Sequence, residues 1–140
     1  MQTFHVYPDY QQTADCLDYK RLNKQRSETY QLLLGQYPYH PAATMWEGYY
    51  NSLVEYGIIM CETHIRRGYD DGLLDTIKNL YQPKGNKAKP PWTNDLRVIN
   101  SHRSSLLKKD FLYYCQFGWN VPTFTGYFWP RPLDYLLGLQ

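Results

Sequence analysis

Residues 42–68 place the strongest constraint on the fold of this chain. Apolar side chains recur here at steps of three and four residues: Trp46, Tyr50, Leu53, Val54, Ile58, Cys61 and Ile65. This is the period of one face of an α-helix, so the stretch predicts a long central core helix that ends at Gly68. At 140 residues the chain is long enough for one domain with a sizeable core and too short for two comfortable ones.

A second helix is predicted over residues 14–34. The segment contains neither Gly nor Pro, Thr13 is a suitable N-cap, and Gly35 is a suitable C-terminal stop. Residues 1–11 alternate in polarity and meet the turn signal Pro8-Asp9. They are therefore expected to form an extended N-terminal arm.

The second half of the chain reads as shorter helices followed by an irregular tail. We expect a helix over 73–82, capped by Asp70 or Asp71, and then an exposed basic loop over 83–92. A further helix should run from a cap at 93–95 to about residue 107, with a break at 100–101 as an alternative. A short helix over 111–116 is expected to follow. The aromatic, Pro- and Gly-rich residues 117–140 are expected to wrap irregularly over the helices. No repeat or linker divides residues 1–140, so we expect a compact, mainly helical single domain.

Composition narrows the class of protein. No signal-peptide pattern opens the chain, and no apolar run approaches the roughly 20 residues that span a bilayer. Three widely spaced cysteines argue against a disulfide framework, and no Cys/His pair has zinc-ligand spacing. A cytoplasmic monomer without a metal is the expectation. The net charge of +2 excludes a bulk polycation, while 17% aromatic residues suit wet interfaces and base stacking.

The most distinctive local feature is the basic segment over residues 19–28. Four cations lie within seven residues of one predicted helix: Lys20, Arg21, Lys24 and Arg26. Cations this dense repel one another unless an anion neutralises them, and a polyphosphate backbone is the usual anion. The alternative is a solvated helix face held by the pairs Asp18–Arg21 and Lys24–Glu28.

A second polar cluster lies over residues 100–110. His102, Arg103 and Lys108 stand among serines and a further lysine within three helical turns. Such a set can clamp phosphates, and His102 can titrate near neutrality as an acid or base. The alternative is a polar helix N-terminus followed by core leucines. No phosphate-cradling Gly loop, zinc-protease motif or nucleophile elbow occurs.

Six stretches of the chain follow one another in a distinctive order: LDYKRLNKQRSE (17–28), HPAATMWEGYYNSLVEYG (40–57), IRRGY (65–69), PPW (90–92), SHRSSLLKKD (101–110) and FGWNVP (117–122). In this order they show a resemblance to the pyrimidine-dimer DNA glycosylase family of the endonuclease V type, and most closely to its uncharacterised bacterial and viral relatives. It implies an all-α domain, and a metal-independent glycosylase and AP lyase that binds double-stranded DNA in the cytoplasm, or in the host cytoplasm if the source is viral.

The chain departs from the family pattern at two catalytic positions. The characterised enzyme uses the α-amine of a threonine exposed by loss of the initiator methionine. Here Gln2 is a bulky residue that normally prevents that loss, so the amine could be that of Met1, of Lys20 or of Lys24, or be missing. Arg21 stands where the family's catalytic glutamate is expected, and Glu28 or Asp18 could replace it.

The resulting candidates fall into two groups. The catalytic candidates are Glu28, Asp18, Met1 and His102, and the DNA-binding candidates are Lys20, Arg21, Lys24, Arg26, Arg103 and Lys108. The leading hypothesis is a DNA repair enzyme that excises a pyrimidine dimer or another altered base. An inactive DNA-binding accessory module of the same fold and a nucleoside- or nucleotide-handling protein are the alternatives.

Overall fold

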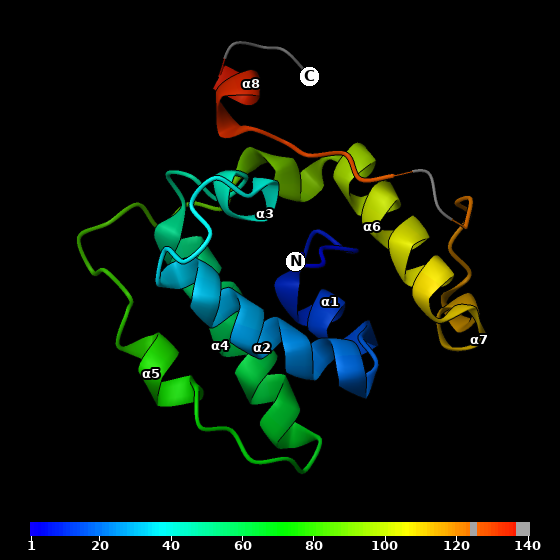
Figure 1. Ribbon diagram of the computed structural model, residues 1–140, viewed down its shortest axis with the longest axis horizontal. Coiled ribbons are helices and arrows are strands. Elements are labelled where there is room, and N and C mark those ends of the chain that lie inside the picture. Colours follow the sequence, from blue (N-terminus) through cyan, green and yellow to red (C-terminus); the bar gives the residue numbers. More distant parts are fainter. Residues whose placement is uncertain (124–125, 137–140) are drawn as a thin grey trace.

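A computed structural model describes residues 1–123 and 126–136, and within these ranges the chain forms helices and loops without a strand. The elements are α1 (Tyr10–Cys16), α2 (Tyr19–Leu33), α3 (Pro41–Thr44), α4 (Tyr50–Arg66), α5 (Leu74–Lys78), η1 (Pro91–Asn94), α6 (Leu96–Lys109), α7 (Phe111–Tyr114), η2 (Cys115–Phe117) and α8 (Pro132–Leu136) (Figure 1). The predicted all-α class is confirmed. None of the described helices is long and apolar enough to cross a membrane.

The packing of α2 along α4 forms the centre of the fold (Figure 1). The two backbones approach closely at Gly57, where an added Cβ would lie 2.8 Å from Cγ2 of Thr29. A glycine in mid-helix costs about 1 kcal/mol relative to alanine, so its presence here reflects this close approach. The predicted central core helix is confirmed in position, with ten buried residues on α4.

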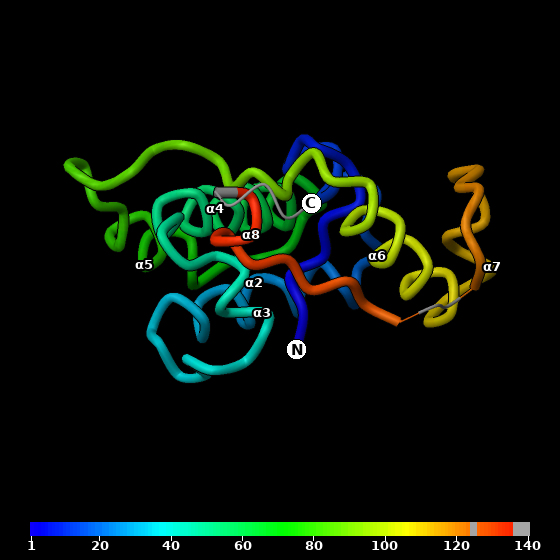
Figure 2. The backbone as a smooth tube through the Cα atoms, turned by 90° about the horizontal axis from the view of Figure 1, so that it is seen from above, coloured from blue at the N-terminus to red at the C-terminus, as the bar shows by residue number. Residues whose placement is uncertain are grey.

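The N-terminal arm lies between α2 and α6, as two perpendicular views show (Figures 1 and 2). Its backbone is bound on both sides: the Phe4 amide donates to Oε1 of Gln25 on α2, and the His5 amide donates to Nδ1 of His102 on α6, each at 2.9 Å. The arm extends only to Asp9, because the Asp9 side chain accepts from two amides and starts α1 at Tyr10. The extended arm is thus confirmed, but it is buried between helices.

The predicted single helix over 14–34 is wrong, because the chain breaks between α1 and α2. Leu17 and Asp18 are extended, with ψ of 138° and 163°. Leu17 is fully buried, and Tyr114 anchors Asp18 by donating its hydroxyl proton to the carboxylate and accepting the Asp18 amide. These contacts with a distant part of the chain override local helix propensity. Thr13 is not the N-cap and lies inside α1.

The predicted helix over 42–68 also begins later than expected. Pro41 opens the short α3, as the sequence indicates, and Gly48 then turns the chain with a φ of +84° before α4 starts at Tyr50. This turn lets Trp46 enter the core, where its Nε1 donates to Oγ1 of Thr3 at 3.0 Å. The predicted end at Gly68 is confirmed, since α4 ends at Arg66 and Gly68 has a φ of +92°.

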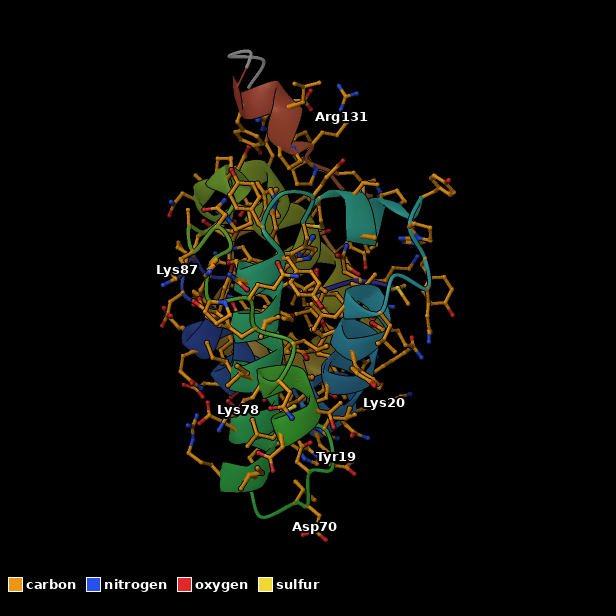
Figure 3. All side chains as sticks on the ribbon, turned by 90° about the vertical axis from the view of Figure 1, so that its left-hand side faces the viewer. Tyr19, Lys20, Asp70, Lys78, Lys87 and Arg131 are labelled. Atoms are coloured by element: carbon orange, nitrogen blue, oxygen red, sulfur yellow. The ribbon has the colours of Figure 1, made fainter. Side chains whose placement is uncertain are left out.

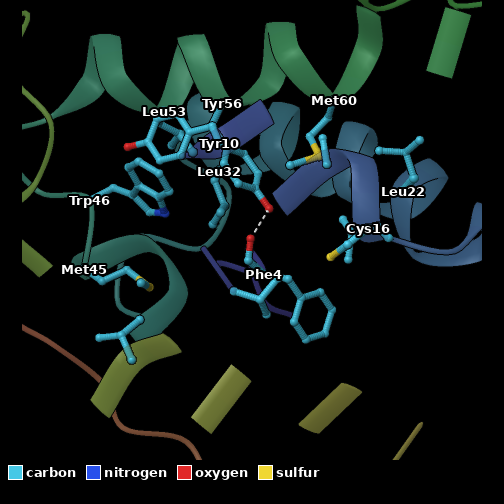
Figure 4. Close-up of a cluster of buried hydrophobic side chains, with 14 of the residues drawn as sticks. Phe4, Tyr10, Cys16, Leu22, Leu32, Met45, Trp46, Leu53, Tyr56 and Met60 are labelled. Atoms are coloured by element: carbon cyan, nitrogen blue, oxygen red, sulfur yellow. Dashed lines mark hydrogen bonds between the residues drawn. The ribbon is translucent and has the colours of Figure 1, made fainter. Parts of the chain in front are cut away.

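Aromatic side chains fill the space between the arm, α1 and α4 (Figure 4). Tyr56 is fully buried, and its hydroxyl lies 2.7 Å from the Phe4 carbonyl oxygen. Tyr10 packs edge-on to Tyr56, with 5.5 Å between ring centroids. The high aromatic content therefore serves the core first, and the rings also hold the arm in place.

The C-terminal half matches the sequence analysis in outline. The helix expected over 73–82 is the shorter α5, with the Leu73 amide bound to Asp71, and Asp95 caps α6, which runs unbroken to Lys109. The short helix expected over 111–116 appears as α7 and η2. The tail is irregular over most of its described length and ends in α8, which the sequence did not predict. The parts of the predicted tail at 124–125 and 137–140 lie outside the described residues.

Candidate active site

A cleft of about 350 Å³ opens where the N-terminal arm meets α2 and the end of α6. Its walls come from four parts of the chain. They are formed by Met1, Gln2, Phe4, Lys20, Arg21, Lys24, Gln25, Glu28, Lys109 and Tyr127. The cleft therefore combines a carboxylate, several cations, two aromatic rings and the first residue of the chain.

The structure brings half of the predicted site residues together here. Five of them line the cleft: Met1, Glu28, Lys20, Arg21 and Lys24. The other five do not: Asp18, His102, Arg26, Arg103 and Lys108. Helix geometry explains four of the first group, because residues 20, 24 and 28 recur every four positions, residue 21 lies three before 24, and all four share one side of α2.

Glu28 supplies the carboxylate of the cleft. It is 8% exposed, and its Oε2 lies 3.4 Å from both the Gln2 amide nitrogen and Nε2 of Gln25. Its Oε1 lies 3.7 Å from Nζ of Lys24. A buried carboxylate needs such partners, because desolvation penalises its charged form. The Gln2 contact places the start of the chain against this carboxylate.

The cations of the cleft are only partly neutralised within the protein. Arg21 forms the predicted pair with Asp18 at 3.3 Å, and Lys24 forms the predicted pair with Glu28 while its own side chain is 68% exposed. Lys20 and Lys109 are exposed on the cleft wall. Figure 3 shows Lys20 projecting outward beside Tyr19. The exposed ammonium of Lys24 gains little from its pair with Glu28, so Lys20, Lys24 and Lys109 keep charges that are available to an anion.

Asp18 lies away from the cleft, at the break before α2. Its carboxylate accepts the Tyr114 hydroxyl proton and an N–H of Arg21. Burial raises the pKa of Tyr114, and the hydrogen bond to Asp18 raises it further. These partners give Asp18 a structural task, so Glu28 is the better placed of the two carboxylate candidates.

Arg26 faces the protein rather than the cleft, which does not fit its predicted role as a phosphate contact. Its Nε donates to Oδ2 of Asp71 at 2.6 Å, its Nη1 donates to Oδ1 of Asn23, and the residue is 9% exposed. Burial works to raise the pKa of Asp71, but hydrogen bonds from Arg26 and the Leu73 amide keep it below its ordinary value. Arg26 therefore ties α2 to the segment that follows α4.

His102 is fully buried under the arm, and the expectation that it titrates near neutrality does not fit this environment. Burial lowers its pKa to about 3, with a further contribution from His5. Its Nδ1 accepts the His5 amide, so the neutral ring carries its proton on Nε2. His102 thus acts as an uncharged acceptor that positions the arm beside the cleft.

The buried histidines predict a loss of stability in acid. Burial lowers the pKa of His5 to about 4 and of His102 to about 3, whereas unfolded histidines bind protons near pH 6.5. Below that pH the unfolded state binds more protons, so the free energy of unfolding should fall by about 1.4 kcal/mol per pH unit for each histidine. Urea titrations between pH 7.5 and 4.5 measure this slope.

His102→Asn is the informative variant for this effect, because its side-chain oxygen can still accept the His5 amide. We expect the share of the slope that His102 contributes, about 1.4 kcal/mol per pH unit, to disappear. His40→Asn is the matched control, since His40 caps α3 through Nδ1 and lies elsewhere. Equal slopes in the wild type and His102→Asn would show that burial does not lower the pKa of His102 in the folded protein.

The two remaining predicted DNA contacts lie on α6. Arg103 donates from Nε to the Val6 carbonyl oxygen at 2.9 Å, and its guanidinium lies 4.8 Å from the Tyr7 ring and 5.2 Å from the Trp119 ring. It therefore links the arm, α6 and the tail. Lys108 is exposed on the last turn of α6, next to the cleft residue Lys109.

Sequence reasoning missed several cleft residues. Lys109 stands beside the predicted Lys108, and only the orientation of α6 decides which of the two faces the cleft. Gln25 was within the basic segment but has no charge to single it out. Tyr127 comes from the tail, where its hydroxyl lies 2.6 Å from Oγ of Ser105, and no local pattern could place it beside α2.

The described parts of the chain contain no cluster of side chains suited to bind a metal ion. Among residues 1–123 and 126–136, no three His, Cys, Asp or Glu side chains gather in a way that could hold a metal ion. The free thiols of Cys16 and Cys61 are buried, and Cys115 is exposed.

Comparison with known proteins identifies the family. The family model described as pyrimidine dimer DNA glycosylase matches residues 1–76, which include the arm, α1, α2, α3 and α4. No curated protein and no solved structure matches the chain. The matched residues cover more than half of the 140 and contain every cleft residue that the arm and α2 supply. This chain belongs to the pyrimidine dimer DNA glycosylase family.

Proposed function

We propose that this protein removes a pyrimidine dimer or another altered base from double-stranded DNA and cleaves the strand at the abasic site. In this proposal the α-amine of Met1 is the nucleophile and Glu28 is the assisting carboxylate. One observation carries the proposal: the Gln2 amide nitrogen, one residue from that amine, lies 3.4 Å from Oε2 of Glu28 in a cationic cleft.

The chemistry uses an amine and a carboxylate in sequence. The lone pair of an uncharged amine attacks C1′, the bond from C1′ to the base breaks, and the base leaves with that electron pair and a proton. The nitrogen then loses a proton, the C1′–O4′ bond opens, and O4′ takes a proton to leave an imine. Loss of a C2′ proton and breakage of the C3′–O bond release the 3′ phosphate.

Glu28 is the side chain that suits the proton transfers. Among the described residues that line the cleft it carries the one carboxylate. Acid–base catalysis by a positioned group contributes about 10²- to 10⁴-fold to a rate. The partners of Glu28 at 3.4 Å are long hydrogen bonds, which leave the carboxylate able to exchange a proton with a bound sugar.

The Met1 amine is favoured over lysine on chemical grounds. An α-amine is in general a weaker base than a lysine side chain, which makes it the more available nucleophile near neutral pH. Lys20 and Lys24 line the same cleft and are the alternative nucleophiles.

The exposed cations favour a polymer over a free nucleotide. Lys20, Lys24 and Lys109 are exposed on the cleft wall, where they can contact successive phosphates. Such contacts release counterions and position the duplex, while Phe4 and Tyr127 offer apolar surface to a displaced nucleotide.

Borohydride trapping tests the mechanism and identifies the nucleophile. Borohydride reduces the imine to a stable amine, so incubation with a duplex carrying an abasic site, or a thymine dimer, should give a covalent adduct. Trypsin then separates the candidates. An adduct on Met1 lies in peptide 1–20, one on Lys20 blocks cleavage and appears in peptide 1–21, and one on Lys24 blocks cleavage after residue 24.

Each result has a distinct meaning. An adduct in peptide 1–20 supports the proposal, and an adduct on Lys20 or Lys24 replaces the nucleophile but keeps the lyase. Normal DNA binding without any adduct would reject the lyase and identify an inactive DNA-binding protein of this fold.

DNA affinity should depend on salt through the cleft cations. Each lost phosphate contact lowers the slope of log K against log salt by about 0.9 in magnitude, so Lys20→Ala with Lys109→Ala should lower it by about 2. Fluorescence anisotropy with a labelled duplex at several salt concentrations measures this slope.

Lys84→Ala with Lys87→Ala is the matched control, because both lysines are exposed on the basic loop. Figure 3 shows Lys87 on the opposite side of the molecule from Lys20. An unchanged slope in the cleft variant, or an equal fall in the control, would show that DNA does not bind over the cleft.

A further inference from the structure

We infer that Gln25 is a positioning residue that holds the N-terminal arm and the Glu28 carboxylate in one fixed arrangement. The inference rests on the proposed function, since it assigns Gln25 the task of aligning the amine with the carboxylate. Gln25 carries no charge and has no chemistry of its own in the reaction.

The contacts of Gln25 join both catalytic candidates. The side chain is 1% exposed on the cleft face of α2. Its Oε1 accepts the Phe4 amide at 2.9 Å, and its Nε2 donates to Oε2 of Glu28 at 3.4 Å. One carboxamide thus binds the backbone three residues after Met1 and the carboxylate at the same time.

The groups around this carboxamide fix its orientation, and Tyr56 of α4 is a further contact. Its hydroxyl lies 2.9 Å from Oε1 of Gln25 and 2.7 Å from the Phe4 carbonyl oxygen, and it can donate its single proton to either. If the carboxamide were flipped, its NH₂ group would face the Phe4 N–H and its oxygen would face Glu28. Donor would then oppose donor and acceptor oppose acceptor, so only the observed orientation satisfies the buried groups.

The arrangement also distinguishes the two oxygens of Glu28. Oε2 accepts from the Gln2 amide and from Gln25, whereas Oε1 faces Lys24 at 3.7 Å. The two amide donors hold the carboxylate by one oxygen and leave the other turned toward the cleft cations. Gln25 thereby sets which oxygen meets a bound sugar.

Gln25→Glu is the sharpest test of this role. The variant keeps the Oε1 acceptor for the Phe4 amide, but it replaces the donor to Glu28 by a second anionic oxygen. We expect the single-turnover lyase rate to fall by about tenfold or more, because misalignment of reacting groups is costly. The Kd for DNA should change by less than about twofold, since contacts between the protein's cations and the DNA phosphates dominate the affinity.

The pH profile separates positioning from a merely structural role. Like charges side by side favour protonation, so the acid limb of the rate profile of Gln25→Glu should move up by about one pH unit. Gln12→Glu is the matched control, because Gln12 is exposed on α1 and does not line the cleft. A wild-type rate and profile in Gln25→Glu would overturn the inference.

Hydrogen exchange keeps the inference testable if the enzyme chemistry fails. In Gln25→Met the Phe4 amide loses its acceptor and should exchange faster than in the wild type, while the His5 amide, bound to His102, should not change. A wild type that forms no borohydride adduct would reject the proposed function but not the anchoring of the arm. Unchanged exchange at Phe4 would reject the anchoring itself.

Discussion

Glu28→Gln should slow the single-turnover AP lyase reaction by about 10²- to 10⁴-fold, the usual contribution of a positioned acid–base group. The substitution keeps the size of the side chain and an oxygen that can accept the Gln2 amide, but it removes the ability to take and return a proton. DNA binding should persist, because Lys20, Arg21 and Lys109 remain on the cleft wall. Quenched-flow or manual sampling with excess protein on an abasic duplex measures the rate.

Two further variants make this result specific. Glu62→Gln removes an exposed carboxylate on α4 outside the cleft and should leave the rate unchanged. Asp18→Asn tests the other carboxylate candidate, which is bonded to Tyr114 and Arg21. A loss below about threefold for Glu28→Gln together with a large loss for Asp18→Asn would transfer the catalytic role to Asp18.

Trp92→Ala should lower the free energy of unfolding by about 3–5 kcal/mol, the cost of deleting a large buried aromatic side chain. Trp92 is fully buried, its Nε1 donates to the Met45 carbonyl oxygen at 2.7 Å, and its ring meets those of His5 and Trp46 edge-on at 5.3 and 4.9 Å. The truncation leaves a cavity and also an unpaired buried carbonyl.

Urea denaturation at pH 7.5 measures this loss, and the midpoint temperature should fall by about 10 °C or more. Tyr39→Ala is the control, because Tyr39 is 93% exposed and should change stability by less than about 0.5 kcal/mol. A Trp92→Ala protein as stable as the wild type would show that Trp92 does not pack against His5 and Trp46 in the core.

The Trp92 result also bears on the cleft. His5, which packs against Trp92, belongs to the same arm that brings Met1 and Gln2 to Glu28. Loosening the core below the arm should therefore weaken the alignment of amine and carboxylate before the helices unfold, since local openings cost less than global unfolding. In moderate urea, lyase activity should be lost before the far-ultraviolet circular dichroism signal.

The cleft shows why a basic helix is an ambiguous signal in a sequence. On α2, Lys20, Arg21 and Lys24 line the cleft, but Arg26 turns inward to Asp71. The intrahelical pairs expected of a solvated face are also present, at Asp18–Arg21 and Lys24–Glu28. The helix is therefore in part a cationic cleft wall and in part a face held by ion pairs within the protein. Which of the two applies at a given position depends on the partner of that side chain.

Local patterns in the sequence were sufficient for the helical class, the extended arm and the approximate positions of most helices. Apolar spacing of three and four, Pro41 at a helix start, Asp95 as a cap and Gly68 as a stop act over a few residues, so they are visible without tertiary structure. The same spacing put Lys24 and Glu28 on one face of a helix, and the family resemblance drew attention to Met1.

Long-range contacts decided where the helices break and which of the predicted site residues lie together. The break before α2 depends on Tyr114, the pKa of His102 depends on its burial beneath the arm, and Arg26 is withdrawn by Asp71. The meeting of the Gln2 amide with Glu28, 26 residues apart in the chain, is likewise a product of packing. Sequence by itself determined which side chains are available for the chemistry. The tertiary structure decided which of them meet, because burial and distance depend on how distant segments pack.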